Sequence, residues 1–572
     1  MKFCNYSNFP YQVDNPSDLD RYNMLEYILK IQNRYEDMDN IVNILNPPEK
    51  ITDICNVGKG ESFKIAVIGG GAAGLAAVFE LKKVGCNITL FEASSRIGGR
   101  VCTHYFDRSK RHFAEFGPMS IPISHETTWH YINLFNIGTS PFVNHNDNSL
   151  FYVREGCAFN DAGGKSVKSS IYSKFNLKQS EKNKIWFQLK EDLHNKYLLS
   201  LSAEIRKELI SIQKNYSKNI EDIDKINYRN AYESMKPSQD MISLIGQLSG
   251  EEQFFNLSLT EMLQKYYTID HELNYCITDG MINLPYSLYE AICGKNEEVY
   301  KEIPKDKLGK VEVKMETPIN GIYQSVYDNK VILKYKNGIS NRQVEEEFDY
   351  IICAIPFCSL KRIEIKPLFS SVKMRAISEI NYETAHKVFL YLKERFWEKG
   401  SMAKKIIGGC SFTDLPLTSV YYPSDHSQAV VNKYGKWIAK PNKRSDEPGV
   451  LLAAYSWCQK SQVLGNEVSE LQLEDVLKYI ERIHKLPSNY IDEKLIDYKS
   501  LIWSDVQYIW TGGALSKPKD KILFSYAVTS PEMMDKVYFA GEHISQKHVS
   551  LQGALQSGMI AANEIAKRIK EV

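Results

Sequence analysis

The segment at residues 63–93 constrains the fold more than any other part of the chain. It reads as a short apolar strand at 63–70, a glycine-rich turn, a helix with apolar periodicity at 72–85 and a second strand at 87–93. Apolar runs of these lengths, broken by glycines, are typical of strand, helix and strand in succession. The segment therefore predicts a β-α-β unit.

The turn inside this unit has the spacing G-x-G-x-x-G at Gly69, Gly71 and Gly74. The first glycine permits a tight turn, the second lets the backbone approach a pyrophosphate, and the third lets the helix pack on the strand. The helix N-terminus adds free amides and partial positive charge. Near the end of the second strand, Glu92 can bind ribose hydroxyls. A glycine-rich turn alone would be weak evidence, but the complete unit with its acid favours FAD or NAD over NADP.

The composition limits the kinds of partner that the chain can have. Its 572 residues exceed what one hydrophobic core usually supports, so we expect two or three subdomains. A formal net charge of +1 gives no reason to expect nucleic acid or an anionic membrane as a partner. We find no apolar run long enough for a membrane span and no signal-peptide pattern. The 11 cysteines include no C-x-x-C pair, which predicts reduced thiols, no metal site and a soluble, cytoplasmic protein.

The sequence pattern changes several times along the chain. Polar, partly helical sequence precedes the first strand, charge-rich helical sequence runs from about 165 to 265, and strand-like pieces return after it. The expected segments are an N-terminal arm (1–60), a first dinucleotide-binding segment (61–125), a mainly helical insert (126–270), further dinucleotide-binding and sheet segments (271–365), a substrate-binding domain (366–530) and a closing dinucleotide-binding segment (531–572).

Six ordered motifs follow the glycine turn. They are GGRV at 98–101, ITDGMINLP at 277–285, TAHKVFLYLKERFW at 384–397, FTDLPLTSVYYPSDH at 412–426, VLLAAYSW at 450–457 and VYFAGEHISQKHVSLQGALQSGMIAA at 537–562. Together they resemble the flavin amine oxidase superfamily, nearest to the L-amino acid oxidases, L-glutamate oxidases and tryptophan 2-monooxygenases. The resemblance implies an α/β fold (α+β overall). Its parts would be a Rossmann-like FAD-binding domain built from discontinuous segments, a mixed-sheet substrate-binding domain and a helical insert.

The resemblance also implies FAD as the cofactor. Arg100 would pair with the phosphates, Glu542 would meet a ribityl hydroxyl and Val313 would meet the adenine. The residues carried over as FAD contacts are Gly69, Gly71, Ala72, Ala73, Gly74, Glu92, Ala93, Gly99, Arg100, Gly117, Pro118, Met119, Val313, Glu542, Val549, Ser550, Leu551 and Ala554. Without the family, Glu542 could equally be a helix N-cap carboxylate. Ala514 stands where relatives with covalent flavin have a cysteine, so we expect noncovalent FAD.

Lys387 is the candidate catalytic residue. In similar enzymes the lysine of this strand holds a water near flavin N5, and here it lies in the apolar stretch AHKVFLYL. A lysine among apolar residues is desolvated, which lowers its pKa. The alternative is a structural lysine whose charged end reaches solvent at a sheet edge.

Two positions of the expected substrate pocket depart from the family pattern. Ser120 stands where L-amino acid oxidases have an arginine that binds the substrate α-carboxylate, and Ser550 stands where the family often has an aromatic wall residue. Serine cannot replace the bidentate contact of arginine. Three interpretations remain open: another cation or the Tyr421/Tyr422 pair binds the carboxylate, the substrate lacks a free α-carboxylate, or the chain is an FAD-binding scaffold without turnover.

The function implied by the resemblance is oxidation of an amino acid or an amino-acid-derived amine. A hydride would leave the amine-bearing carbon, and molecular oxygen would be reduced to hydrogen peroxide while the imine hydrolyses to a carbonyl compound and ammonia. A monooxygenase that converts an amino acid to an amide with decarboxylation is an alternative. The expected partners are a small amine or amino-acid-like molecule and oxygen, and a homodimer is left open.

Overall fold

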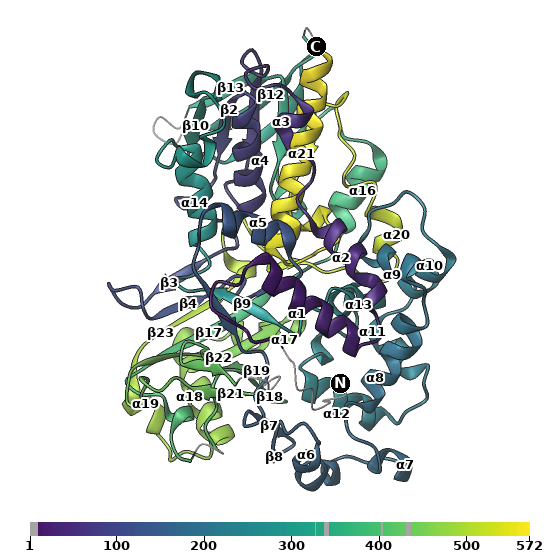
Figure 1. Cartoon of the computed structure of the whole chain (residues 1–572), viewed down its shortest axis with the longest axis vertical. Coiled ribbons are helices and arrows are strands. Elements are labelled where there is room, and N and C mark those ends of the chain that lie inside the picture. Colours follow the sequence, from purple (N-terminus) through teal and green to yellow (C-terminus); the bar gives the residue numbers. More distant parts are fainter. Residues whose placement is uncertain (1–9, 326–327, 337–341, 402–403, 431–435) are drawn as a thin grey trace.

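The parallel sheet at the centre of the upper part of the molecule is built from distant segments of the chain (Figure 1). The computed structural model describes residues 10–325, 328–336, 342–401, 404–430 and 436–572. All neighbouring strands of this sheet are parallel. The strand order is β10 (Val311–Lys314), β2 (Asn87–Phe91), β1 (Lys64–Ile68), β14 (Tyr350–Cys353) and β25 (Val537–Phe539).

Alternate side chains of the central strands enter two different cores. Ile65 and Val67 of β1 belong to the same buried cluster as the helices α4 (Ala72–Lys83) and α21 (Leu551–Glu571). Ala66 and Ile68 belong to a second cluster that covers the other face. Successive side chains of a strand point to opposite faces, so a strand buried on both faces is apolar throughout.

The helix face depends on the close approach of α4 and α21, which lie side by side in Figure 1. A Cβ atom at Gly558 of α21 would lie 2.2 Å from the carbonyl oxygen of Ala73 in α4. Only glycine leaves room for two helices at this separation. Helix α14 (Asn283–Ile292) packs against α4 beside this pair.

A small sheet supplies the second core. Its strand order is β13 (Gln343–Phe348), β12 (Val331–Lys336), β11 (Ile319–Gln324) and β15 (Glu364–Lys366). Ile322, Leu333 and Phe348 from these strands are completely buried in the same cluster as Ala66 and Ile351 of the parallel sheet. The two faces of the parallel sheet are therefore covered by helices and by a second sheet.

A seven-stranded sheet forms a separate layer in the lower part of Figure 1. Its strand order is β23 (Leu495–Ile502), β17 (Ala385–Leu392), β22 (Gly449–Trp457), β19 (Ser419–Tyr421), β18 (Cys410–Thr413), β7 (Leu150–Val153) and β8 (Gly156–Phe159). Strand β7 pairs parallel with β18, while the other neighbours are antiparallel. The hairpin β7–β8 joins this sheet although the sequence analysis placed it in a mainly helical segment.

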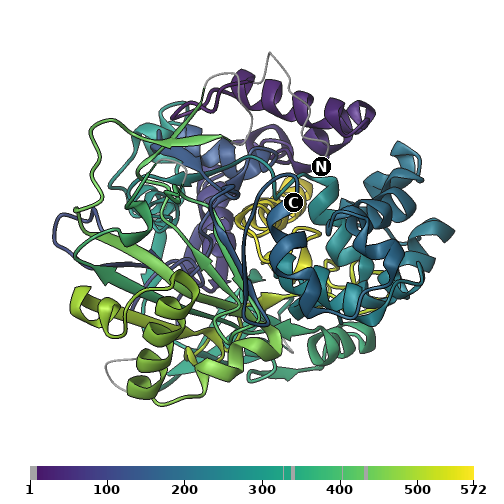
Figure 2. The same ribbon diagram turned by 90° about the horizontal axis from the view of Figure 1, so that it is seen from below.

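Short helices fill the chain between this hairpin and strand β9 (Asn274–Ile277). They run from α6 (Lys165–Ser170) to α13 (Leu259–Tyr267) and lie opposite the seven-stranded sheet in Figure 2. No helix in the described ranges has both the length and the apolar character needed to cross a membrane. The mixed α/β architecture expected from the sequence is confirmed.

The N-terminal segment is packed into the molecule. Helix α1 (Asp18–Ile31) begins at Ser17, whose side chain accepts a hydrogen bond from the Asp20 amide in a capping box. Arg21 of α1 forms a buried ion pair with Glu126 at 2.7 Å. Helices α2 (Met38–Leu45) and α3 (Ile51–Ile54) complete the segment.

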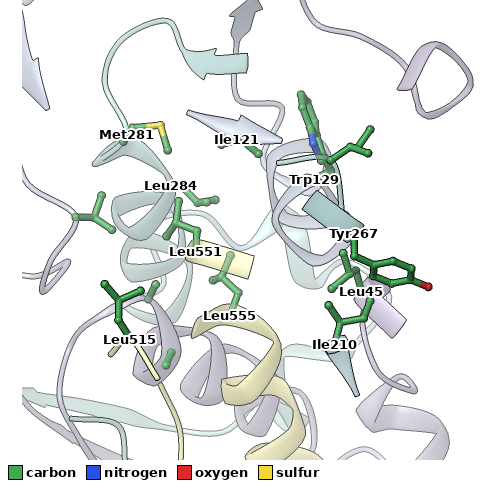
Figure 3. Close-up of a cluster of buried hydrophobic side chains, with 14 of the residues drawn as sticks. Leu45, Ile121, Trp129, Ile210, Tyr267, Met281, Leu284, Leu515, Leu551 and Leu555 are labelled. Atoms are coloured by element: carbon green, nitrogen blue, oxygen red, sulfur yellow. The ribbon is translucent and has the colours of Figure 1, made fainter. Parts of the chain in front are cut away.

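One extended core joins the N-terminal segment, the helical region and the parallel-sheet helices. The cluster in Figure 3 collects side chains from segments far apart in the sequence. Its labelled residues are Leu45, Ile121, Trp129, Ile210, Tyr267, Met281, Leu284, Leu515, Leu551 and Leu555. The described arm, the helical region and the helices of the parallel sheet are therefore held together by shared packing.

Candidate active site

A cavity of about 1240 Å³ is lined by all parts of the fold. The glycine turn and the end of β2 contribute Gly71 and Glu92, the seven-stranded sheet contributes Lys387, the helical region contributes Lys265 and α1 contributes Ile28. This volume exceeds the roughly 300–1,000 Å³ of typical small-molecule pockets, so the cavity has room for a large organic ligand. Most of the site residues predicted from the sequence line this cavity.

The glycine turn presents bare backbone to this cavity. Gly69 has φ +106°, and a Cβ atom there would lie 2.7 Å from the carbonyl oxygen of Ala354. Gly71 is the N-cap of α4, and a Cβ atom there would meet only the Cα of Gly99 at 4.0 Å. The first turn of α4 contains no acidic residue and no side chain caps it. The free amides and the helix dipole are therefore available to a phosphate group.

The third glycine of the fingerprint is structural. A Cβ atom at Gly74 would lie 2.0 Å from the carbonyl oxygen of Gly69, so this residue lets α4 pack on the end of β1. Gly74 is not among the residues that line the cavity in the described chain. It supports the turn, and its predicted role as a direct FAD contact stays a prediction.

Glu92 follows β2 and lines the cavity. One carboxylate oxygen accepts the Gly70 amide at 2.8 Å, and the other accepts the amide of Ser94 at 2.8 Å and its hydroxyl at 2.7 Å. Each carboxylate oxygen has two lone pairs, so the oxygen held by Gly70 can also accept a ribose hydroxyl. The position of this carboxylate fits the predicted role of Glu92 in binding ribose hydroxyls.

Arg100 and Glu542 form an ion pair on the cavity wall. Arg100 Nη1 lies 2.6 Å from Glu542 Oε1. The carboxylate also accepts the amides of Val549 at 2.8 Å and of Ala514 at 3.2 Å. Burial raises the pKa of Glu542, but Arg100, aided by two neighbouring histidines and the Val549 amide, more than offsets this effect, so the pKa stays below its usual range. Glu542 is therefore ionised, with its acceptor positions mostly occupied by the protein.

The segment at 117–119 passes along the cavity close to the Gly-Gly-Arg turn. A Cβ atom at Gly117 would lie 2.0 Å from the carbonyl oxygen of Arg100, so only glycine fits. Gly117, Pro118 and Met119 all line the cavity. Their backbone is in position to run beside a flat ring system.

Lys387 lies on β17 with 2% of its surface exposed, and it lines the cavity. Its Nζ donates to the carbonyl oxygens of Glu115 at 2.8 Å and Gly117 at 2.6 Å. Burial lowers the pKa of Lys387 to about 7, although the nearby Glu115 carboxyl opposes the shift. Burial also raises the pKa of Glu115 to about 8. Lys387 is a buried amine attached to the 117–119 segment, and it does not reach solvent at a sheet edge.

An aromatic wall, which we define as Phe254, Tyr455 and Trp457, faces the same cavity. Lys387 and Tyr455 are direct cross-strand partners on β17 and β22, and the Lys387 Nζ lies 4.7 Å from the Tyr455 ring centroid. The centroids of Tyr455 and Trp457 are 6.2 Å apart, and those of Trp457 and Phe254 are 6.4 Å apart. The sequence analysis missed this wall. The sequence VLLAAYSW could have indicated that Tyr455 and Trp457 belong together, because residues two apart on a strand share a face.

Ser120 and Ser550 both line the cavity, and both hydroxyls accept hydrogen bonds from the protein. Ser120 Oγ accepts the Asn274 side-chain amide at 3.3 Å. Ser550 is the N-cap of α21; its Oγ accepts the Gly553 amide at 3.1 Å and donates to the Lys547 carbonyl at 2.6 Å. Neither serine provides a cation for a carboxylate.

The two tyrosines of the predicted pair point to different places. Tyr421 lines the cavity, with its ring centroid 5.9 Å from that of Tyr455. Tyr422 is buried in the core of the seven-stranded sheet, where its hydroxyl bonds Ser411 at 2.8 Å and His484 at 3.0 Å. The prediction that Tyr422 binds substrate is corrected, because neighbouring residues of an extended chain face opposite sides.

Most of the other predicted contacts meet at the cavity. The residues of the prediction that line it are Gly69, Gly71, Ala72, Ala73, Glu92, Ala93, Gly99, Arg100, Gly117, Pro118, Met119, Ser120, Lys387, Tyr421, Glu542, Val549, Ser550, Leu551 and Ala554. Val313 lies on β10 opposite Leu90 and is not among the lining residues of the described chain. The described residues contain no group of three metal-binding side chains.

Comparisons with known proteins agree with this geometry. The pattern of the family described as flavin containing amine oxidoreductase matches residues 72–566. The chain is 27% identical over 518 residues to an L-amino-acid oxidase of Sistrurus catenatus edwardsii and 28% identical over 507 residues to one of Bungarus fasciatus. Each alignment covers 88% of this chain and 86% of the relative. A solved putrescine oxidase shares the fold with a TM-score of 0.64 and 15% identity, over 88% of this chain and 98% of that protein.

The chain therefore belongs to the family of flavin-containing amine oxidoreductases, and its cofactor is FAD. The residues fit that cofactor. The α4 N-terminus and Arg100 would hold its phosphates, Glu92 would hold its ribose, and the 117–119 backbone would lie beside its ring system.

We predict that FAD is released when the protein is denatured. Ala514, on β24 (Gly513–Ala514), offers only a methyl group where a covalent link would need a thiol. After precipitation with acid, the yellow colour should remain in the supernatant and coelute with authentic FAD. Flavin that stays with the precipitated protein would contradict noncovalent binding.

We predict that Glu542→Gln weakens both the fold and FAD retention. The change leaves the Arg100 guanidinium without its acid, which we expect to cost about 3–5 kcal/mol, since loss of one partner of a buried pair is strongly destabilising. Thermal melting and the ratio of FAD to protein measure the two effects. The matched control is Glu379→Gln, which breaks an exposed pair with Arg375 and should cost about 0–1 kcal/mol. Equal melting shifts for the two variants would contradict the prediction.

Proposed function

We propose that the chain, as a member of the flavin-containing amine oxidoreductase family, oxidises the amine-bearing carbon of an amino acid or an amino-acid-derived amine. In the overall reaction, the amine, molecular oxygen and water would give a carbonyl compound, ammonia and hydrogen peroxide. Bound FAD would supply the acceptor for the hydride that leaves the substrate carbon. The observation that carries the proposal is Lys387, a buried amine on the cavity wall beside the 117–119 segment.

The contacts of Lys387 support a role in proton transfer. A neutral amine has two N–H donors and one lone pair, and Lys387 has two carbonyl acceptors, from Glu115 and Gly117. Because burial lowers its pKa to about 7, a large share of the amine is uncharged near neutral pH. Its lone pair can then accept a proton from the substrate ammonium, directly or through a water. A deprotonated substrate amine expels hydride readily, since its nitrogen lone pair stabilises the developing imine.

The two serines bear on which amine is oxidised. Ser120 and Ser550 each have one neutral O–H donor and offer no bidentate, charged contact for an α-carboxylate. This favours either a substrate whose carboxylate is absent or blocked, such as an amine, an amide or an ester, or a substrate whose anion is bound elsewhere in the cavity. The ten described cysteines are free thiols, which supports the proposal that the reaction takes place in a reducing compartment, the cytoplasm.

The first test uses the purified FAD-bound protein with L-amino acids, their amides and esters, and simple alkylamines. We expect anaerobic bleaching of the flavin by at least one class, and one peroxide released per oxygen consumed. Oxygen consumption with an amide product and no peroxide would instead indicate the monooxygenase reaction. Bound flavin that none of these compounds reduces would overturn the proposed oxidase activity in favour of an FAD-binding scaffold.

We predict that Lys387→Met slows flavin reduction by roughly 100-fold or more, as expected for loss of a general base. In the unmodified protein, kcat/KM should rise with pH through about 7, because the acceptor is the neutral amine. The variant should lose this rise, and only the pH dependence of kcat/KM that comes from ionisation of the substrate amine should remain. Stopped-flow reduction across pH measures both.

The control for this variant is Lys499→Met. Lys499 is the exposed cross-strand neighbour of Phe389 on β23, so the change removes a lysine from the same sheet without touching the cavity. We expect its pH profile to match that of the unmodified protein. If Lys387→Met keeps the rise of kcat/KM near pH 7, a group other than Lys387 causes that rise.

A further inference from the structure

Among the buried and part-buried cations of the cavity, Lys265 is the one whose charged group has no hydrogen bond or ion pair with the described residues. The lysines and arginines that line the cavity in the described chain are Arg34, Arg100, Lys190, Lys265, Arg362 and Lys387. Arg34, Arg100, Lys190 and Lys387 bind acids or backbone carbonyls. Arg362 is exposed and lies over Trp510. Lys265 is part-buried and, within the described ranges, makes no hydrogen bond or ion pair with the protein.

Lys265 lies at the far end of the aromatic wall from Lys387. Its Nζ is 5.6 Å from the ring centroid of Phe254, and Phe254 packs against Trp457. Tyr455 connects Trp457 to Lys387. Three rings that all line the cavity therefore separate the two lysines. A substrate that contacts both lysines must extend along this wall.

The effect of Lys265 on the pKa of two neighbouring groups, Cys458 and Glu261, shows that its ammonium lies close to the aromatic wall and to helix α13. Burial raises the pKa of the Cys458 thiol, directly after Trp457, and the Lys265 ammonium opposes that shift. Lys265 also contributes to the low pKa of Glu261, one helical turn earlier in α13, although burial opposes that lowering and His548 contributes more. The Glu261 carboxylate is occupied by His548 at 2.7 Å and by the Ser516 amide at 3.1 Å. It therefore leaves the Lys265 ammonium free for another anion.

We propose that Lys265 binds a carboxylate of the substrate, and that this carboxylate is several bonds away from the oxidised carbon. The inference rests on the proposed amine oxidation, with the amine end near Lys387. Ser120 offers no cation beside the 117–119 segment, whereas Lys265 provides an unpaired ammonium at the other end of the wall. The substrate class is thus an amine with a remote carboxylate, and its hydrocarbon portion lies against Phe254, Trp457 and Tyr455.

The test compares matched substrates that differ only in the carboxylate. We would measure steady-state kinetics with 6-aminohexanoate and hexylamine, and with norleucine and pentylamine as the α-carboxylate pair. In the unmodified protein, 6-aminohexanoate should have a lower KM than hexylamine, and norleucine should gain nothing over pentylamine. Lys265→Met should raise the KM for 6-aminohexanoate by about 10- to 100-fold, as expected for loss of a charge-assisted hydrogen bond, with kcat little changed.

The same variant should leave the KM for hexylamine unchanged, and Lys265→Arg should restore binding of 6-aminohexanoate, because it restores the charge. Lys218→Met, on the exposed face of α10 (Lys218–Asp224), is the control and should change neither substrate. If Lys265→Met changes both substrates equally, or if the unmodified protein discriminates against 6-aminohexanoate, the proposal is overturned.

A binding measurement separates this inference from the proposed activity. Hexanoate carries the carboxylate without the amine, and its binding can be followed by perturbation of the flavin absorbance in the holoprotein. We expect Lys265→Met to weaken hexanoate binding by about 10-fold or more, whether or not any amine is oxidised. Equal hexanoate affinity in the two proteins, or no binding in either, would exclude Lys265 as the anion site, while the oxidase activity would stand or fall separately.

Discussion

Much of the cavity depends on one buried carboxylate, that of Glu542. It binds the Arg100 guanidinium and the backbone amides of Ala514 and Val549. These groups belong to the turn after the first β-α-β unit, to a short strand near the seven-stranded sheet and to the loop before the last helix. Burying a charge is costly unless its lone pairs are occupied, and here three donors occupy them. One side chain thereby holds three segments around the place where the flavin ring system would lie.

The two buried cations of the site are accommodated in different ways. Arginine cannot lose its proton in a protein, so Arg100 needs an acid, and Glu542 provides it. Lysine can become neutral, and Lys387 has only carbonyl acceptors and a pKa of about 7. The side chain of Glu115, close to Lys387, responds in the opposite direction and tends to stay protonated, with a pKa of about 8. The permanent charge suits a structural and phosphate-binding role, and the variable charge suits proton transfer.

Local sequence was enough to predict the glycine turn, because the G-x-G-x-x-G spacing between a strand and a helix is a local pattern, although Gly69 also leaves room for the distant Ala354 carbonyl. The same was true of Lys387, whose apolar neighbours on one strand already imply desolvation. Reasoning from single residues failed at Tyr422, because the direction of a side chain depends on the register of the strand that carries it. It also missed Tyr455, whose importance comes from being the cross-strand partner of Lys387.

By itself, the sequence determined the β-α-β unit, the resemblance to flavin amine oxidases and the missing arginine at Ser120, since each of these is a matter of residue type at a fixed spacing. Only the tertiary structure decided what surrounds the substrate. Lys265 and Phe254 come from the helical insert, whereas Tyr455 and Trp457 come from strand β22, far away along the chain. Their proximity follows from long-range packing, and no local spacing encodes it.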